Sequence, residues 1–211
     1  MIKVAFLLDR SNDWLAAYLP TNVGNLSRFE FHEVYDEEKV RGFDIVFLLG
    51  YTKIVKGEIL SSNKLLLVVH ESDLPKGKGF APVQWQILEG VNEIKISLLE
   101  VGEKVDSGAM IEQLQLLFNG KELYDEIRSK QANATFELIS RFLAKYPEFS
   151  TSQQMGKSTL YRKRTPEDSE LDIDKTIRDQ FQLLRVCNNE SWPAFFLLDG
   201  TRYTLKIYND N

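Results

Sequence analysis

With 211 residues, the chain has room for one full domain and a small appendage but not for two large domains. Hydrophobic residues make up 43% of it and charged residues 27%, which excludes the composition of disordered chains. The net charge of -5 disfavours a nucleic-acid partner, since binding a phosphate backbone requires a clustered excess of Lys and Arg.

The sequence carries no signal for a membrane or for disulfide bonds. No charged N-terminal region leads into a long apolar run, and no run approaches the roughly 20 residues that a membrane helix needs. The single cysteine, Cys187, cannot form an internal disulfide. We therefore expect a soluble, cytoplasmic protein without a membrane partner.

Short apolar runs dominate the first third of the chain. Residues 2–8, 43–49 and 65–69 are nearly continuous in aliphatic and aromatic side chains, as in strands buried on both faces of a parallel sheet. A further strand is predicted at 29–34. This pattern predicts an α/β fold with a Rossmann-like, open, mostly parallel sheet. Ligands bind at the carboxyl ends of strands in such sheets, so the residues after 49 and 69 are the first candidates for chemistry.

Other elements complete the predicted main domain. A helix is expected at 12–19 and ends at Pro20, whose ring cannot continue it. Two more strands are expected at 93–99 and 109–113, and a long amphipathic helix at 121–146.

The chain is predicted to divide into a main domain, 1–150, and a small C-terminal module, 151–211. A polar, Gly-bearing stretch marks the boundary. The module is expected to contain a β-hairpin that turns at Asp199 and Gly200, because this dipeptide accepts the positive φ angles of a tight turn. Its predicted elements are one helix and two strands: 174–186, 194–198 and 202–208.

Two polar side chains stand where predicted strands end. His70 enters a loop rich in Gly and Pro, the position at which α/β enzymes place acid and base groups. Spacing alone leaves an ordinary strand-end histidine equally acceptable. Asp106 begins a turn with Ser107 and Gly108, and such a turn is by itself typical of a plain loop. His32 lies in an alternating strand and is interpreted as solvent-exposed.

Two classes of active site are excluded by the residue inventory. One Cys and two His in unrelated settings do not form a zinc ligand set, so no metal is expected. No Gly-x-Ser-x-Gly elbow is present, which removes support for a serine hydrolase.

The segment from Val69 to Leu88, VHESDLPKGKGFAPVQWQIL, resembles the signature of the formyltetrahydrofolate-dependent formyltransferases. That pattern is a His, then Ser, Leu-Pro, a Gly a few residues on, and a Pro with Gln or an aromatic residue beyond. The family's second hallmark, an Asp-x-Gly turn, matches Asp106 to Gly108 at a similar separation. The order of the two motifs makes coincidence improbable, and the resemblance covers residues 1–145.

The resemblance implies an N-formyltransferase that uses 10-formyltetrahydrofolate as formyl donor. His70 would manage the proton of an acceptor amine that attacks the formyl carbon, and Asp106 would orient His70 and support the charged tetrahedral species. The folate donor would be bound by five residues in the two motifs and in the loop after 49: Gly50, Tyr51, Ile54, Ser72 and Gly108.

One position departs from the family pattern. The family has Asn two residues before the His, and this chain has Val68. The change removes a hydrogen-bond donor to the developing oxyanion, a loss of about 100-fold or more in rate. Asn63 lies five residues further back and cannot replace it. Either another donor or water substitutes, or the chain is a weakened relative.

The tail favours a small acceptor. Methionyl-tRNA formyltransferases have a larger, basic C-terminal domain, whereas this tail resembles that of enzymes acting on nucleotide-linked 4-amino-4,6-dideoxy sugars. We expect such a substrate, specifically a UDP-sugar in pseudaminic acid biosynthesis, and a tail hairpin that can pair two copies into a homodimer. The expected substrate-binding residues come from the His loop and the tail: Pro75, Lys76, Lys78, Gln84 and Arg162.

The alternatives are other acceptors and a loss of activity. Glycinamide ribonucleotide, methionyl-tRNA or a carrier-bound aminoacyl group could supply the amine. A catalytically weakened, folate-binding relative is the non-enzymatic alternative, favoured by Val68 and the short tail.

Overall fold

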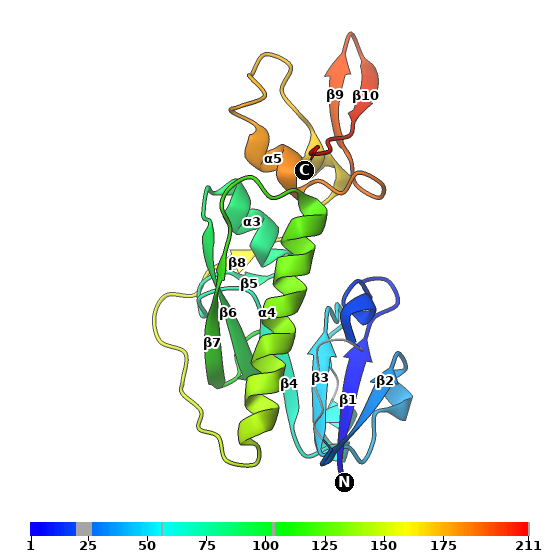
Figure 1. Cartoon of the computed structure of the whole chain (residues 1–211), viewed down its shortest axis with the longest axis vertical. Helices are drawn as coiled ribbons and strands as arrows, with labels where there is room; N and C mark the ends of the chain where they lie inside the picture. The colour runs from blue at the N-terminus through cyan, green and yellow to red at the C-terminus, as the bar shows by residue number, and fades with distance from the viewer. Residues whose placement is uncertain (20–26, 56, 103, 211) are drawn as a thin grey trace.

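The computed structural model describes residues 1–19, 27–55, 57–102 and 104–210. The strands of the main sheet are β1 (Ile2–Leu8), β2 (Phe29–Val34), β3 (Ile45–Leu49), β4 (Leu66–His70), β6 (Glu93–Glu100) and β7 (Met110–Leu117). They lie in the order β2-β1-β3-β4-β6-β7 (Figure 1). The first four are parallel, and β6 and β7 each pair antiparallel with the preceding strand. The predicted open, mostly parallel α/β sheet is confirmed.

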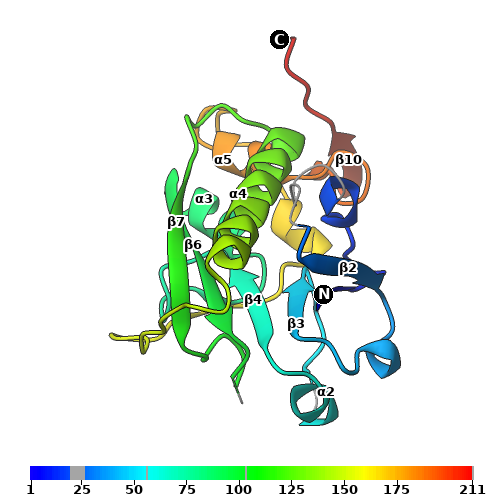
Figure 2. The same cartoon turned by 60° about the horizontal axis from the view of Figure 1, so that its bottom comes forward.

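Both faces of the sheet are covered, as the continuous apolar runs require. Helix α4 (Tyr124–Lys145) lies across one face (Figure 2). Its apolar stripe packs on inward side chains such as Phe6 and Phe47. The other face packs on Ile59 of the short helix α2 (Gly57–Ser62). Every residue of β3 is buried between these two clusters.

The carboxyl ends of β1, β3 and β4 meet at one edge of the sheet, after Leu8, Leu49 and His70. Strands β2 and β3 flank β1 on opposite sides, so the direction of winding reverses there. Such a reversal opens a crevice at the carboxyl edge in which α/β proteins bind ligands. The fold therefore assembles the residues after these strands into one candidate site.

Three short elements flank this edge. Strand β5 (Lys78–Gly79) pairs in parallel with β8 (Leu160–Tyr161). This pairing connects the loop that follows His70 with the segment that follows α4. Helix α3 (Pro82–Leu88) follows β5 directly. Two 3-10 turns, η2 (Glu37–Lys39) and η3 (Pro166–Ser169), lie in connecting segments.

Two predicted helices are shorter than expected. Of the helix predicted at 12–19, residues Ala16–Tyr18 form a 3-10 turn, η1, and Pro20 lies outside the described residues. The helix predicted at 174–186 is wrong in its first half, since α5 spans only Phe181–Val186. The Gln180 side chain bonds the backbone of Asp172 in both directions, and such local side-chain bonds compete with the helical ladder.

The predicted hairpin is confirmed as β9 (Ala194–Leu198) and β10 (Thr201–Leu205), which project from one end of the molecule (Figure 1). Asp199 and Gly200 have φ angles of 50° and 78°, the positive values of a primed turn. The base of the hairpin packs on α5 and Leu171 in a small separate cluster.

A buried ion pair joins α5 to the loop before α4. Arg185 of α5 is fully buried, and its Nη2 lies 2.9 Å from Oε2 of Glu122, just before α4. Burial would raise the pKa of Glu122, but hydrogen bonds from Lys130 and the Asn119 N–H bring it to about 2. Burial also lowers the pKa of Arg185. The division into 1–150 and 151–211 stays a prediction, and the two parts share this contact.

Candidate active site

His70 ends β4 in a buried position, with 6% of its surface exposed. Its Nε2 lies 2.8 Å from the carbonyl oxygen of Gly77. A carbonyl only accepts, so Nε2 carries the proton in this contact and the neutral ring keeps its lone pair on Nδ1. The loop after β4 thereby selects the nitrogen that is able to accept a proton.

Asp106 faces that nitrogen. Its Oδ2 lies 3.5 Å from Nδ1 of His70 and accepts a hydrogen bond of 2.9 Å from the Gly79 N–H. Asp106 has a φ of 50°, a left-handed conformation that Asp tolerates better than most residues. Gly108 is held against the Glu100 carbonyl, where a Cβ would come within 1.7 Å, so only Gly fits. The two residues that the resemblance paired are therefore neighbours.

The five residues expected to bind folate fall into two groups. Ser72 and Gly108 belong to the two loops that hold the His–Asp pair, and Ser72 is 1% exposed beside Gly77. Its Oγ has no hydrogen-bond partner among the described residues, which leaves a buried polar atom available to a ligand. Gly50, Tyr51 and Ile54 instead follow the neighbouring strand β3, and Ile54 is 74% exposed.

The loop after β3 is tied to the loop after β1. Gly50 has a φ of 59°, and its carbonyl accepts a hydrogen bond of 2.7 Å from Nδ2 of Asn12. The Thr52 hydroxyl donates to Asp9, which also accepts from the backbone and hydroxyl of Ser11. These bonds, first among them that from Thr52, lower the pKa of Asp9 to about 2. Asp9 is therefore a fixed negative charge rather than an acid or base near neutral pH.

A surface hollow of about 810 Å³ lies beside these loops. Arg10 and Lys53, which follow β1 and β3, line it together with Tyr35 and Ile54. The Arg10 guanidinium stacks on the Tyr35 ring at 4.4 Å. Sequence analysis missed both cations, although their place after β1 and β3, on either side of the winding reversal, could have indicated them.

The residues expected to bind the acceptor differ in their availability. Pro75 and Gln84 are buried, and Nε2 of Gln84 has no hydrogen-bond partner in the described part of the chain. Lys76 is exposed, and Lys78 is half-buried in β5. Arg162 is already engaged, because its guanidinium pairs with Asp168 and lies 4.8 Å over the Trp85 ring.

Val68 lies on the same face of β4 as His70, between Leu48 of β3 and Leu99 of β6. It is half-buried and packs in the apolar cluster of that face. Asn63 is fully engaged elsewhere, since its amide bonds the backbone of Phe43, Val40 and Ile59. As expected, Asn63 does not substitute for the family asparagine.

Three residues of the C-terminal part contact the loops that hold His70 and Asp106, and sequence analysis missed them. The Gln154 amide bonds the turn of Asp106, and the Thr159 hydroxyl accepts from the Gly77 N–H. The Tyr161 ring packs against Gly77, where a Cβ would approach to 2.9 Å. No local pattern marks these contacts, because they span 48 and 82 residues of sequence.

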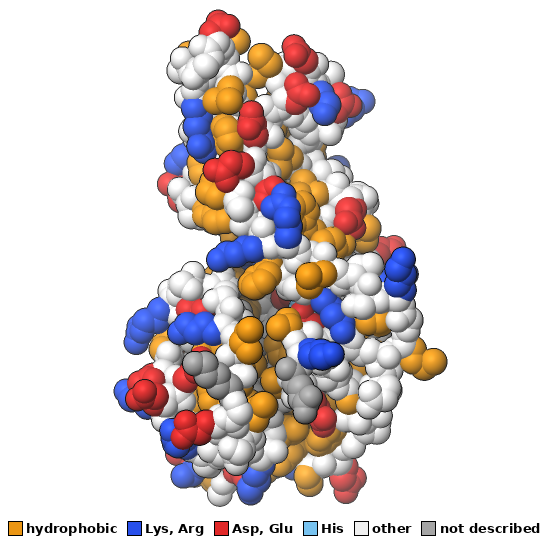
Figure 3. All heavy atoms as spheres, turned by 180° about the vertical axis from the view of Figure 1, so that it is seen from behind, with side chains coloured by type: hydrophobic (Ala, Val, Ile, Leu, Met, Phe, Trp, Pro, Cys, Tyr) orange, Lys and Arg blue, Asp and Glu red, His pale blue; other side chains and the backbone are white. Residues whose placement is uncertain are grey.

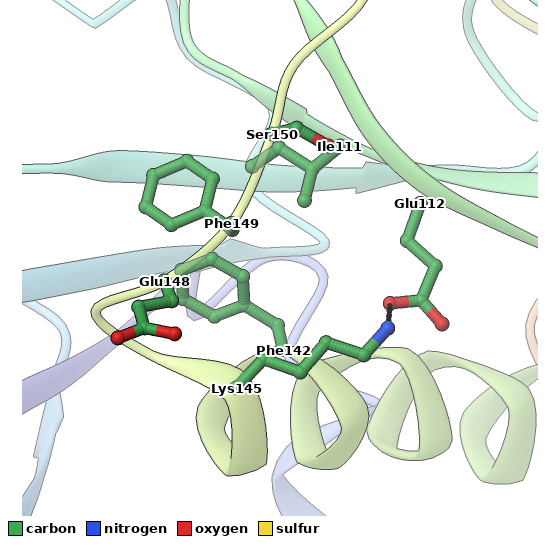
Figure 4. Close-up of a pocket in the computed structure, with 7 residues that line it drawn as sticks. All are labelled: Ile111, Glu112, Phe142, Lys145, Glu148, Phe149 and Ser150. Atoms are coloured by element: carbon green, nitrogen blue, oxygen red, sulfur yellow. Dashed lines mark hydrogen bonds and ion pairs between the residues drawn. The ribbon is translucent and has the colours of Figure 1, made fainter.

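Other cavities and clusters lie apart from this edge. A small pocket of about 190 Å³ between β7 and the end of α4 is lined by Phe142, Phe149 and the Lys145–Glu112 ion pair (Figure 4). In the part of the chain that the structure describes, no group of three or more His, Cys, Asp or Glu could hold a metal ion. Within the same part, no helix is long and apolar enough to cross a membrane.

The fold and the His–Asp pair agree with one family. Residues 15–143 match the family model described as formyl transferase, and the chain belongs to this family, which uses 10-formyltetrahydrofolate as formyl donor. A methionyl-tRNA formyltransferase from Mycoplasmopsis pulmonis is 29% identical over 180 residues. The bifunctional polymyxin resistance protein ArnA of Wigglesworthia glossinidia brevipalpis is 24% identical over 188 residues. These matches cover 83% and 86% of this chain but only 61% and 27% of the two relatives.

Solved structures agree on the fold. A methionyl-tRNA formyltransferase from Clostridium thermocellum superposes with a TM-score of 0.84 at 21% identity, covering 100% of this chain and 94% of that one. A 4-N formyltransferase from Francisella tularensis gives a TM-score of 0.78 at 16% identity, covering 99% and 98%. HypX from Aquifex aeolicus, solved with tetrahydrofolic acid, gives 0.74 at 15% identity, covering 97% and 37%.

Proposed function

We propose that the chain transfers the formyl group of 10-formyltetrahydrofolate to an amine. The observation that carries this proposal is the His70–Asp106 pair at the carboxyl edge, in which Nδ1 of His70 is the nitrogen left to accept a proton. Family membership supports the donor, and the unpartnered hydroxyl of Ser72 beside the pair fits a polar ligand.

The geometry suits one sequence of steps. The acceptor amine forms a bond to the formyl carbon and gives its proton to Nδ1 of His70. Asp106, 3.5 Å away, stabilises the resulting imidazolium. When the tetrahedral species collapses, the bond from the formyl carbon to N10 of the folate breaks. N10 then takes the proton from Nδ1 of the His70 imidazolium. The products are a formamide and tetrahydrofolate.

We propose a nucleotide-linked 4-amino-4,6-dideoxy sugar as the acceptor, with a UDP-sugar of pseudaminic acid biosynthesis as the specific candidate. Residues 151–211 carry nine Lys and Arg against nine Asp and Glu, which gives no basic surface excess for RNA. Lys76 and Lys78 have no carboxylate partner among the described residues and are available to a diphosphate. Arg162 would have to exchange Asp168 for the phosphate.

The competing acceptor is methionyl-tRNA. It is favoured by the 29% identity to the Mycoplasmopsis pulmonis enzyme, which exceeds the 15% identity to a sugar N-formyltransferase from Shewanella.

A mass-shift screen tests donor and acceptor together. The full chain is incubated with 10-formyltetrahydrofolate and UDP-, dTDP- or GDP-linked amino sugars, with methionyl-tRNA as a separate arm. Gain of one formyl group by a nucleotide sugar is the expected result. Formylation of methionyl-tRNA alone would overturn the proposed acceptor, and no formylation in any arm, with no folate binding, would overturn the proposed function.

Two further features of the proposal concern the setting of the enzyme. We propose a cytoplasmic location. We also propose a homodimer formed through the hairpin, because its outer apolar side chains Leu197, Leu198 and Tyr203 are 44 to 46% exposed. Hydrophobic side chains are visible on this narrow end of the molecule (Figure 3).

A further inference from the structure

The segment after α4 returns to the catalytic edge and contacts both loops that hold the His–Asp pair. It lies beyond residues 15–143, the part matched by the family model. In the described chain, it reaches the Asp106 turn first, through Gln154, and the His70 loop five residues later, through Thr159.

Gln154 holds the Asp106 turn by its side-chain amide. Nε2 donates to the carbonyl oxygens of Asp106 and Gly108, each at 2.9 Å. The first carbonyl belongs to Asp106, the left-handed residue whose carboxylate faces His70, and the second to Gly108 two residues later, so one amide spans the turn across Ser107. The preceding part of the segment adds a backbone bridge between Ser152 and Met110, where β7 begins.

Thr159 bonds the loop that follows His70 through its side chain and its backbone. Its hydroxyl accepts from the Gly77 N–H at 2.8 Å, while its backbone N–H and carbonyl bond Pro75 and Lys78 at 3.3 and 3.0 Å. Gly77 is the residue whose carbonyl accepts from Nε2 of His70. One bond therefore separates the Thr159 hydroxyl from the residue that fixes the tautomer of the histidine.

We propose that Thr159 and Gln154 are positioning residues of the active site: Thr159 fixes the Gly77 carbonyl that sets the His70 tautomer, and Gln154 fixes the Asp106 turn. The proposal rests on the proposed function for its kinetic consequences but not for its structural ones. The C-terminal segment is then part of the catalytic machinery, rather than only a carrier of acceptor specificity.

The chemistry explains why the tautomer matters. If the Gly77 carbonyl moves away, the neutral ring can carry its proton on Nδ1 instead, and that nitrogen can no longer accept the proton of the amine. Binding of the donor and of the acceptor does not depend on this proton. Loss of the Thr159 hydroxyl should therefore lower kcat and leave both KM values nearly unchanged.

The first experiment compares Thr159→Val with Thr159→Ser in the full chain. Valine removes the hydroxyl with little change in shape, whereas serine keeps it. Thr201→Val is the matched control, because Thr201 is exposed on β10 and its side chain makes no hydrogen bond among the described residues. We expect Thr159→Val to lower kcat by about 10-fold with KM within about 2-fold, and serine to restore it, since one backbone hydrogen bond is at stake.

Nitrogen NMR of the His70 ring supplies a readout that loss of stability alone would not move. The wild type and Thr159→Ser should show the Nε2–H tautomer, and folded Thr159→Val should show a mixture. A folded Thr159→Val with unchanged ring shifts and unchanged kcat would overturn the role of Thr159. If Thr159→Val does not fold, the wild-type ring decides: an Nδ1–H tautomer there overturns the proposal, and an Nε2–H tautomer supports it.

Gln154 is tested beside its neighbour. Gln154→Leu removes the amide that spans the Asp106 turn, and Gln153→Leu makes the same change at an exposed residue without a side-chain hydrogen bond in the described chain. Only Gln154→Leu should lower kcat, again about 10-fold at constant KM. Equal effects of the two variants would overturn the role of Gln154. If the wild type transfers no formyl group, the proposed function fails, while the tautomer measurement still tests Thr159.

Discussion

The two halves of the carboxyl edge each hold a well-buried aspartate, but they use it in opposite ways. After β1 and β3, Asp9 accepts from the Ser11 backbone, the Ser11 hydroxyl and the Thr52 hydroxyl, so both of its oxygens are engaged. After β4 and β6, Oδ2 of Asp106 accepts from the Gly79 N–H and lies 3.5 Å from Nδ1 of His70, while Oδ1 has no hydrogen bond from any described residue. The first aspartate joins two loops, and the second faces a titratable ring.

The difference shows how environment assigns a role to one residue type. A carboxylate surrounded by donors is stabilised in its charged form and stops responding to pH near neutrality, as the lowered pKa of Asp9 shows. In the proposed mechanism, Asp106 keeps part of its hydrogen-bonding capacity for a charge that appears during the reaction. Exchange of the residues in either half tests this division of labour.

The largest effect is expected in the second half of the edge. His70→Ala and Asp106→Asn should each lower formyl transfer by at least about 100-fold, because proton transfer and charge stabilisation are lost. The chain should stay folded, since both residues lie at the end of the sheet outside its apolar clusters. Steady-state kinetics measures the loss. Asp199→Asn is the matched control, since Asp199 has the same φ of 50° in an exposed turn. Near-normal turnover in a folded His70→Ala or Asp106→Asn enzyme would refute the mechanism.

Val68→Asn asks whether the second half has merely lost an oxyanion donor. Val68 packs among apolar side chains between Leu48 and Leu99, so we expect asparagine to bury an unpartnered amide there. Turnover should fall, and the free energy of unfolding should decrease by about 1 to 3 kcal/mol. Urea unfolding and kinetics of this one variant decide the question. A clear rise in kcat at constant folate affinity would mean that the site was damaged rather than rebuilt.

The sequence located the His70–Asp106 half of the edge better than the other half. Apolar runs and strand ends located His70, and the family motif located Asp106, because both signals are local. Thr159 and Gln154 carry no such signal, since their contacts with the two loops join segments that are distant in the sequence. The first half of the helix predicted at 174–186 was wrong for a related reason. Asp, Thr and Gln side chains there bond nearby backbone groups, and a pattern of apolar spacing does not detect that competition.

Asp9→Asn tests the first half of the edge, where stability rather than turnover should change. The pKa of Asp9 falls from an ordinary 3.8 to about 2 in the folded chain, so its charge contributes stability above pH 3.8 that is lost as pH falls through 2. The contribution is about 2 kcal/mol at most. Asparagine should lower the free energy of unfolding at neutral pH by about 2 kcal/mol. The variant should also lose less of its free energy of unfolding than the wild type when the pH is lowered. An unchanged acid unfolding profile would show that Asp9 does not carry this charge effect.

The smallest effect on catalysis is expected at the β9–β10 hairpin, because it is distant in the sequence from both halves of the carboxyl edge. Its variants therefore serve as a control for the substitutions in both halves. A two-stranded ribbon is marginal in water unless its apolar face is covered, and the base of this one is covered by the cluster around α5. Leu198 and Tyr203 lie outside that cover, with 45% and 46% of their surfaces exposed. A second copy of the hairpin would bury them, so the double substitution Leu198→Ser and Tyr203→Ser should convert a dimer into a monomer by light scattering while kcat stays within about 2-fold. Thr204→Ser on the same strand should leave the dimer intact. A wild type that is monomeric by light scattering would refute the proposed homodimer. A large loss of kcat on dissociation would show that the active site at the edge of the sheet depends on the partner copy.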